Sequence, residues 1–222
     1  MAISIDTVYQ KVLTFANKEQ RGYITPQEYN LFADQAQKEI FEQYFYDLNQ
    51  YHKLHGENSE YVDVITNINE KLSIFETTAT MNSTTLPSNL YRLGSVYSGN
   101  IIVEEVQRDE FNSMQSSPLT MPTQNRPIYV RKSSTTIETE PISAPTKCSY
   151  IKIPTSPYWG YVVVGGKAMY DPSSTVDFEL HNAEETELVY KILKFAGLSI
   201  KKDDLSRGGQ GLESLQVQQE KQ

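Results

Sequence analysis

Apolar residues recur at helical spacing through the first third of the chain. A first helix is predicted to begin after Ser4 or Asp6, either of which can act as its N-cap. Its apolar stripe comprises Val8, Val12, Leu13 and Phe15. A later helix follows Gly56, with Asn58 or Ser59 as its cap. Its stripe comprises Val62, Ile65, Ile68 and Leu72.

The clearest helix start is the segment "TPQE". Thr25 is predicted as the N-cap, Pro26 as the first helical residue, and Glu28 as the side chain that completes a capping box. Gly22, in the preceding break, permits a left-handed turn. We expect this helix to run to about His52. One face of it carries Tyr29, Phe32, Ala33, Ala36, Ile40, Tyr44, Tyr51 and Leu54.

Four apolar residues of this long helix lie well outside that face: Leu31, Phe41, Phe45 and Tyr46. A helix that is apolar over most of its circumference needs more than one neighbour. Either the helix is central in its own domain, or another subunit covers part of it. We therefore treat these four residues as candidates for an oligomer interface.

The pattern changes near Phe75, after which short apolar runs are bounded by Pro, Gly, Ser and Asn as far as about Leu180. These runs predict strands: "LYRLGSVYS", "NIIVEEV", "PIYVRKS", "TIETEP", "CSYIKIP", "GYVVVGG" and "VDFEL". The segment "RDEFNSMQSS" predicts a short helix. The segment "SSPLTMPTQNRP" predicts a loop, because its prolines cannot occupy a central strand.

A last helix is predicted within "HNAEETELVYKILKFAGLSI", with Asn182 as the cap, Glu185 three residues later and Gly197 as the stop. Beyond Lys202 the chain is rich in glutamine, and its apolar residues are Leu212, Leu215 and Val217. Such a segment cannot bury enough surface to fold alone. It is expected to be a flexible tail or an arm that orders against a partner, and its three apolar residues are further interface candidates.

Together these patterns predict an α+β protein with an N-terminal helical hairpin or bundle, an antiparallel β-rich middle, a C-terminal helix that packs back, and an extended tail. The expected regions are residues 1–76 (helical), 77–180 (β-rich), 181–202 (the C-terminal helix, joined to the core) and 203–222 (the tail).

Composition narrows the function. The formal net charge is −8, which disfavours DNA or anionic-membrane binding through a basic patch. No apolar run is long enough to span a bilayer, and no signal peptide is expected. A single cysteine, Cys148, allows no intrachain disulfide and fits a reducing cytoplasm. Fifteen tyrosines suit either a β-rich core or surfaces that become interfaces.

The stretch "NKEQRGYITPQE" has the glycine and glutamate spacing of a calcium loop. Its ligand positions would be Asn17, Glu19, Arg21 and Glu28. Arg21 would place a cation against the metal, and a helix begins inside the loop. We therefore predict a helix–helix connection and no metal.

Other candidate chemistry is equally incomplete. "GYVVVGGKAMY" lacks a glycine and a hydroxyl residue that a phosphate loop requires, so its two glycines predict a hairpin turn or a bulge between strands. His52 and His55 lack further ligands nearby, and His181 is expected at a strand-to-helix junction. No nucleophile–base pair accompanies Cys148. The glutamate pairs at 104–105 and 184–185 are expected to be solvated or capping. Trp159 fits core packing and an interface anchor equally. We predict no catalytic residue, metal or cofactor.

Two stretches carry a family resemblance: Lys18 to Tyr51, and Ser156 to Ile200, above all "FEL…ETELVYKIL…AG". Together with the middle region they resemble structural proteins of tailed bacteriophages, podovirus-like and crAss-like, that form head–tail connector rings or adaptors below the portal. Residues Ser98 to Lys147 do not contribute to the resemblance.

The resemblance implies a non-enzymatic virion protein at the neck, assembled in the host bacterial cytoplasm. Its partners would be copies of itself in a ring, dodecameric in this group, together with the portal protein and tail-side proteins. Genomic DNA would pass through without specific binding, and no membrane would be involved. The alternatives are another virion component, such as a tail or capsid-decoration protein, or a calcium-binding module.

Overall fold

The computed structural model describes residues 3–18, 24–53 and 59–199. It divides into two compact units. One, the helical unit, is drawn from Met1–Ile74 and Pro154–Gln222. The other, the sheet unit, is Phe75–Ile153. Both helices and strands are therefore major components, and the predicted α+β class is confirmed.

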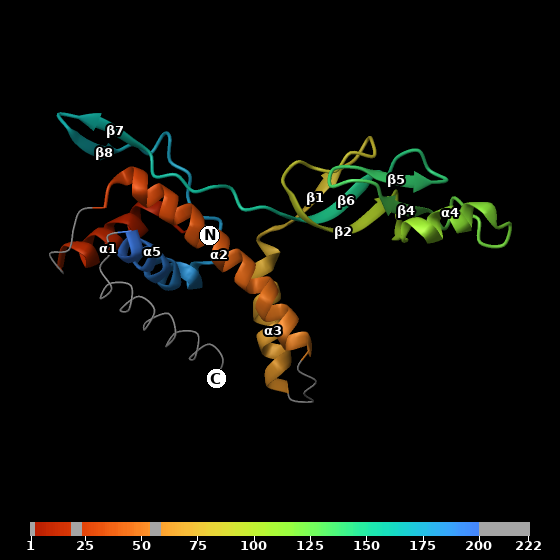
Figure 1. Ribbon diagram of the computed structural model, residues 1–222, viewed down its shortest axis with the longest axis horizontal. Helices are drawn as coiled ribbons and strands as arrows, with labels where there is room; N and C mark the ends of the chain where they lie inside the picture. The colour runs from red at the N-terminus through yellow and green to blue at the C-terminus, as the bar shows by residue number, and fades with distance from the viewer. Residues whose placement is uncertain (1–2, 19–23, 54–58, 200–222) are drawn as a thin grey trace. The chain divides into compact units, whose positions relative to one another are not determined.

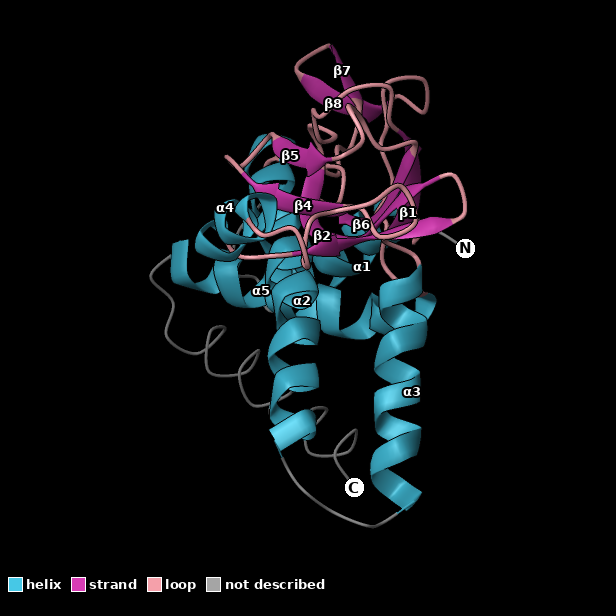
Figure 2. Ribbon diagram, turned by 90° about the vertical axis from the view of Figure 1, so that its right-hand side faces the viewer, coloured by secondary structure: helices cyan, strands magenta, loops and turns pink. Residues whose placement is uncertain are grey.

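The helical unit contains α1 (Ile5–Lys18), α2 (Pro26–Lys53), α3 (Ser59–Ser73), the strands β7 (Tyr161–Val164) and β8 (Lys167–Tyr170), the 3-10 turn η1 (Asn182–Glu184) and α5 (Glu185–Ser199). Helix α2 packs against both α5 and α3, and α1 packs against α5. Figure 2 shows α2 and α3 side by side. The largest fully buried side chains of this unit are Ile5, Ile24, Tyr29, Ile40, Phe178, Leu180, Leu188 and Ile192.

The start of α2 is fixed by a local polar network. The backbone N–H of Thr25 donates to Oε2 of Glu28 at 3.0 Å, and the N–H of Glu28 donates back to Oγ1 of Thr25 at 3.3 Å. This is the predicted capping box, and it satisfies two N–H groups that a helix start otherwise leaves unpaired. The Thr25 hydroxyl also donates to Oε2 of Glu28 at 2.7 Å, and this bond, with the one from the Thr25 N–H, holds the pKa of Glu28 below its usual value.

The burial of several apolar helix residues differs from the prediction. Phe41 is buried within its own chain and meets Phe45 edge to face at 5.1 Å between ring centroids. Its assignment to an oligomer interface was wrong, because neighbours within the chain already cover it. Phe45 is half-buried, and Leu31 and Tyr46 are exposed. Phe15, predicted to join the first stripe, is also exposed.

The last helix differs from its prediction at both ends. His181, and not Asn182, is the N-cap, since its backbone is extended (φ −66°, ψ 145°) and its ring accepts the N–H of Ala183. Gly197 keeps helical geometry, and α5 continues to Ser199. A glycine stops a helix only where it adopts a left-handed conformation.

The sheet unit contains β1 (Glu76–Thr80), β2 (Leu90–Ser98), β3 (Ile101–Glu105), α4 (Arg108–Ser116), β4 (Ile128–Arg131), β5 (Ile137–Glu140) and β6 (Lys147–Lys152). The strand order is β1-β6-β2-β3-β4-β5. Strands β3 and β4 are parallel, whereas every other pair is antiparallel. The prediction of an antiparallel middle was therefore wrong at this pair, because α4 crosses over and returns the chain to run parallel.

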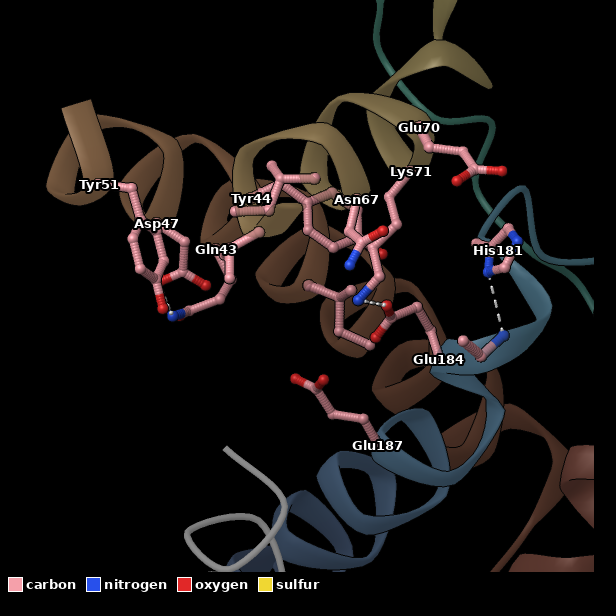
Figure 3. Close-up of a pocket in the computed structure, with 14 residues that line it drawn as sticks. Gln43, Tyr44, Asp47, Tyr51, Asn67, Glu70, Lys71, His181, Glu184 and Glu187 are labelled. Atoms are coloured by element: carbon pink, nitrogen blue, oxygen red, sulfur yellow. Dashed lines mark hydrogen bonds and ion pairs between the residues drawn. The ribbon is translucent and has the colours of Figure 1, made fainter. Parts of the chain in front are cut away.

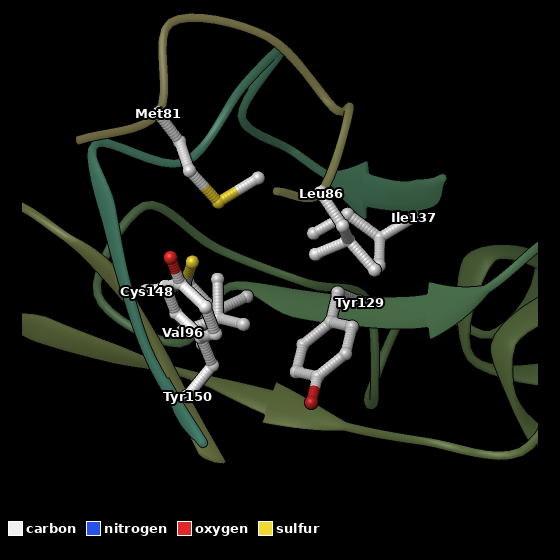
Figure 4. Packing of buried hydrophobic residues seen from close by; sticks show 8 residues of the cluster. Met81, Leu86, Val96, Tyr129, Ile137, Cys148 and Tyr150 are labelled. Carbon is white, nitrogen blue, oxygen red and sulfur yellow. The ribbon is translucent and has the colours of Figure 1, made fainter. Parts of the chain in front are cut away.

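The two outer strands of this sheet are linked by the segment that follows β1. Leu86 N–H donates to the carbonyl of Thr135 at 2.8 Å, and Ile137 N–H donates to that of Thr84 at 3.0 Å. This segment covers the outer edge of β5, and an uncovered edge is where sheets otherwise associate. One apolar cluster packs within the unit (Figure 4); it comprises Met81, Leu86, Val96, Val103, Tyr129, Ile137, Cys148 and Tyr150.

The β-rich stretch predicted at 77–180 is shared between the two units. The sheet unit ends at Ile153, and the β7–β8 hairpin belongs to the helical unit. "VDFEL" forms no strand, since Val176 and Phe178 make only isolated bridges, to Tyr158 and Ile3. Strand β1 was not predicted.

Candidate functional site

The β7–β8 hairpin stands on a buried tryptophan. Trp159 is 3% exposed, and its ring lies 4.5 Å from Tyr9, 5.9 Å from Tyr161 and 5.6 Å from Tyr170, measured between centroids. Its Nε1–H donates to Oδ1 of Asp6 at 2.9 Å. Of its two predicted roles, the structure places Trp159 in the core of its own chain, so it is not an exposed interface anchor.

Helix α2 holds the chain on both sides of the hairpin. The N–H of Trp159 donates to the Asn30 side chain at 2.8 Å, which donates back to the Trp159 carbonyl at 3.3 Å. The buried amide of Gln37 donates to the carbonyl of Thr155 at 2.8 Å and accepts the N–H of Glu179 at 3.1 Å. These segments lead into and out of the hairpin, so its base is fixed to α2.

The turn of the hairpin requires its two glycines. Gly165 and Gly166 have φ of 59° and 78°, a left-handed backbone that other residues rarely adopt. The predicted Gly-Gly turn is therefore confirmed. Gly160, at the base, serves a different need, since a Cβ there would lie 2.6 Å from the carbonyl oxygen of Asp171.

The β7–β8 hairpin, labelled in Figure 1, exposes apolar side chains on both of its faces. Val162, Val163, Val164 and Met169 are each 53–63% exposed. Val162 pairs with Met169 on one face, while Val163 pairs with Ala168 on the other. Among residues Tyr161 to Tyr170 the only charged side chain is that of Lys167. An isolated two-stranded hairpin is marginal in water, so this one depends on its base.

A cleft of about 350 Å³ lies in the same unit, between α2, α3 and the start of α5 (Figure 3). Its apolar lining includes Ile40 and Tyr44 from α2 and Val64 and Ile68 from α3. Four carboxylates also line it: Asp47, Glu70, Glu184 and Glu187. With Lys71 as the one ammonium in the lining, the formal charge is 1 − 4 = −3.

Lys71 already occupies part of this cleft. Its ammonium pairs with the buried carboxylate of Glu184 and lies 5.8 Å from the ring centroid of Tyr44. Glu184 is therefore buried, which corrects its predicted solvated or capping role. Deeper in the unit, Lys191 lies 3.5 Å from Glu187 and 3.7 Å from Glu39. One carboxylate and one aromatic ring thus hold the Lys71 ammonium in the cleft.

Within the ranges that the structure describes, no group of three His, Cys, Asp or Glu side chains is placed to hold a metal ion. Likewise, no helix among the described residues has the length and apolarity needed to cross a bilayer. Of the calcium-loop positions, Glu28 caps α2, and Glu19 and Arg21 lie outside the described residues. His55 also lies outside them.

Of the predicted interface residues, Leu31 and Tyr46 are exposed on α2, whereas Leu212, Leu215 and Val217 lie outside the described residues. The exposed valines of β7 were missed. An unbroken apolar run such as "YVVV" indicates a strand buried on both faces. A run of this kind without cover in its own chain is itself the signal of a contact surface.

Comparisons of the chain with protein-family models and with curated protein sequences found no match.

Proposed function

We propose that this chain is a virion structural protein of a tailed bacteriophage, a subunit of a connector or adaptor ring beneath the portal. Its role is to join capsid to tail and to line the genome channel, without catalysing a reaction. The sequence resemblance over Lys18 to Tyr51 and Ser156 to Ile200 supports this proposal. Both stretches overlap the helical unit that carries the hairpin and the cleft.

The observation that carries the proposal is the β7–β8 hairpin, which combines a fixed base with an exposed apolar tip. Burying a whole Val or Met side chain stabilises by about 1.5–3 kcal/mol. Because the four tip residues are 53–63% exposed, covering them would contribute roughly half of that each, about 3–6 kcal/mol together. Association costs about 4–15 kcal/mol, so one hairpin contact alone gives a weak complex.

A ring suits such weak contacts. Each subunit of a closed ring uses two different patches, and each contact is made once per subunit around the ring. The net charge of −8 supports a channel role, because like charge keeps DNA from adhering to the wall. In this proposal the protein resides at the neck of the virion and assembles in the bacterial cytoplasm with portal and tail-side proteins.

The test is imaging of the purified protein by negative-stain electron microscopy, alone and with the portal protein of the same phage. We expect rings coaxial with the portal. A protein located by immunogold on the capsid surface or tail fibres would favour the decoration or tail alternative. Sequence-specific, tight DNA binding, or failure to join any virion particle, would contradict the proposal.

A further inference from the structure

We propose that the tip of the β7–β8 hairpin of one copy docks in the acidic cleft of the next copy. This inference rests on the proposed function in one respect, that copies of the chain assemble side by side. One side of the proposed contact is the hairpin tip and the other is the cleft, both in the helical unit. Because the two surfaces differ, the copies associate head-to-tail.

The two surfaces are complementary in charge. The hairpin carries Lys167 at its tip and no acidic residue from Tyr161 to Tyr170. The cleft is lined by four carboxylates; Glu184 pairs with Lys71 and Glu187 with Lys191, so Asp47 and Glu70 give the cleft its acidic character. Opposite potentials steer association and fix the register of a complex.

They are also complementary in polarity. Val164 precedes the Gly-Gly turn and is paired with Lys167, so an apolar and a cationic side chain project from the end of the hairpin. The cleft likewise combines an apolar wall, which includes Val64 and Ile68, with carboxylates. The chain already binds one ammonium there, since Lys71 lies against Glu184 and the Tyr44 ring.

The hairpin is held nearer the start of α2 than the residues that line the cleft. Its base is tied to Asn30 near the start of α2, whereas the cleft is lined by α2 residues from Ile40 to Tyr51. From Asn30 the helix rises about 15 Å to Ile40, the first lining residue, and about 25 Å to Asp47. The four-residue strands of the hairpin extend only about 14 Å. In the proposed contact, each copy therefore presents its hairpin tip to one neighbour and its cleft to another.

Two charge reversals test the contact. Lys167→Glu alters only the hairpin tip, and Glu70→Lys alters an exposed side chain of the cleft. Each variant alone should weaken self-association by about tenfold or more, measured as the concentration dependence of mass in sedimentation velocity. Lys38→Glu, an exposed change of equal charge on α2 outside the cleft lining, is the matched control and should associate like the wild type.

Combining the reversals gives the decisive result. An equal mixture of Lys167→Glu and Glu70→Lys copies should associate more strongly than either variant alone, because the acidic tip then meets the lysine introduced at position 70 and the wild-type tip meets the wild-type cleft. The double variant should also reassemble. If the single variants associate as the wild type does, or if the mixture stays unassembled, the hairpin–cleft contact is rejected.

The outcome separates this inference from the proposed function. Rings formed on the portal equally well by wild type and by Lys167→Glu would reject the hairpin–cleft contact and leave the connector role standing. A wild-type chain that remains monomeric at every concentration, with and without portal, would reject both. Circular dichroism of each variant, matching the wild type, shows that the loss of assembly is not loss of fold.

Discussion

The hydrogen bond between Trp159 and Asp6 offers the sharpest test of how the hairpin is held. Asp6 lies in the first turn of α1, and its half-buried carboxylate accepts the indole N–H at 2.9 Å. Asp6→Ala removes this acceptor and leaves the N–H of a buried ring without its partner. Asp6→Asn keeps an acceptor oxygen at the same place and removes only the charge.

The expected magnitudes follow from these contacts. A hydrogen bond to a charged group contributes about 1.5–3 kcal/mol, and a carboxylate in a helix first turn about 0.3–1 kcal/mol. Asp6→Ala should therefore lower the free energy of unfolding by about 2–3 kcal/mol. Asp6→Asn should lower it by about 1 kcal/mol, since the acceptor remains and the charge is lost.

The assay is urea unfolding followed by fluorescence. Trp159 is the single tryptophan of the chain and lies in the helical unit, so its emission reports that unit. Asp63→Ala, an exposed change on α3, is the control and should stay within about 0.5 kcal/mol of the wild type. Equal stabilities for Asp6→Ala and Asp6→Asn would refute the reasoning, because the acceptor would then contribute nothing.

Three further predictions concern single contacts. Gly160→Ala should cost about 2–3 kcal/mol in the same fluorescence assay, because its Cβ would meet the carbonyl of Asp171; wild-type stability would contradict this. Burial, with the hydrogen bond to Glu105, raises the pKa of Tyr129 well above its usual value of 10.0. The neutral Tyr129 side chain stabilises the fold below pH 10, and this contribution is lost as the pH rises above it. Unfolding followed by circular dichroism at pH about 9–12 should therefore show the stability of the wild type decreasing more steeply with pH than that of Tyr129→Phe. Parallel curves for the two proteins would exclude this effect. Because the pKa of Glu28 is lowered in the folded state, its carboxylate stabilises the fold above pH 4.5, and this contribution decreases as the pH falls below 4.5. Glu28→Gln should thus be less stable than wild type at pH 7, and the gap should narrow towards pH 3; a gap independent of pH would disprove the capping charge.

The location of exposed apolar surface has a consequence for assembly. In the sheet unit the segment after β1 covers the edge of β5, whereas the hairpin has no third strand on either edge among the described residues. An exposed apolar edge without protection invites association. We therefore expect substitutions that destabilise the hairpin also to weaken self-association.

The sequence by itself determined the local structure. The capping box of Thr25 and Glu28, the short helix Arg108–Ser116, the strand Leu90–Ser98 and the Gly-Gly turn were all predicted and are confirmed. Each depends on hydrogen bonds or backbone preferences between residues only a few positions apart, so a short stretch of sequence contains the whole cause.

Only the tertiary structure decided which apolar and charged residues are covered. It buried Phe41 and Trp159, exposed Val163, paired Glu184 with Lys71, and made β4 parallel to β3. These outcomes depend on segments far apart in the chain, whose approach no local pattern encodes. A run of valines has the same sequence whether a core or a partner covers it, because the hydrophobic effect rewards burial and does not specify the neighbour.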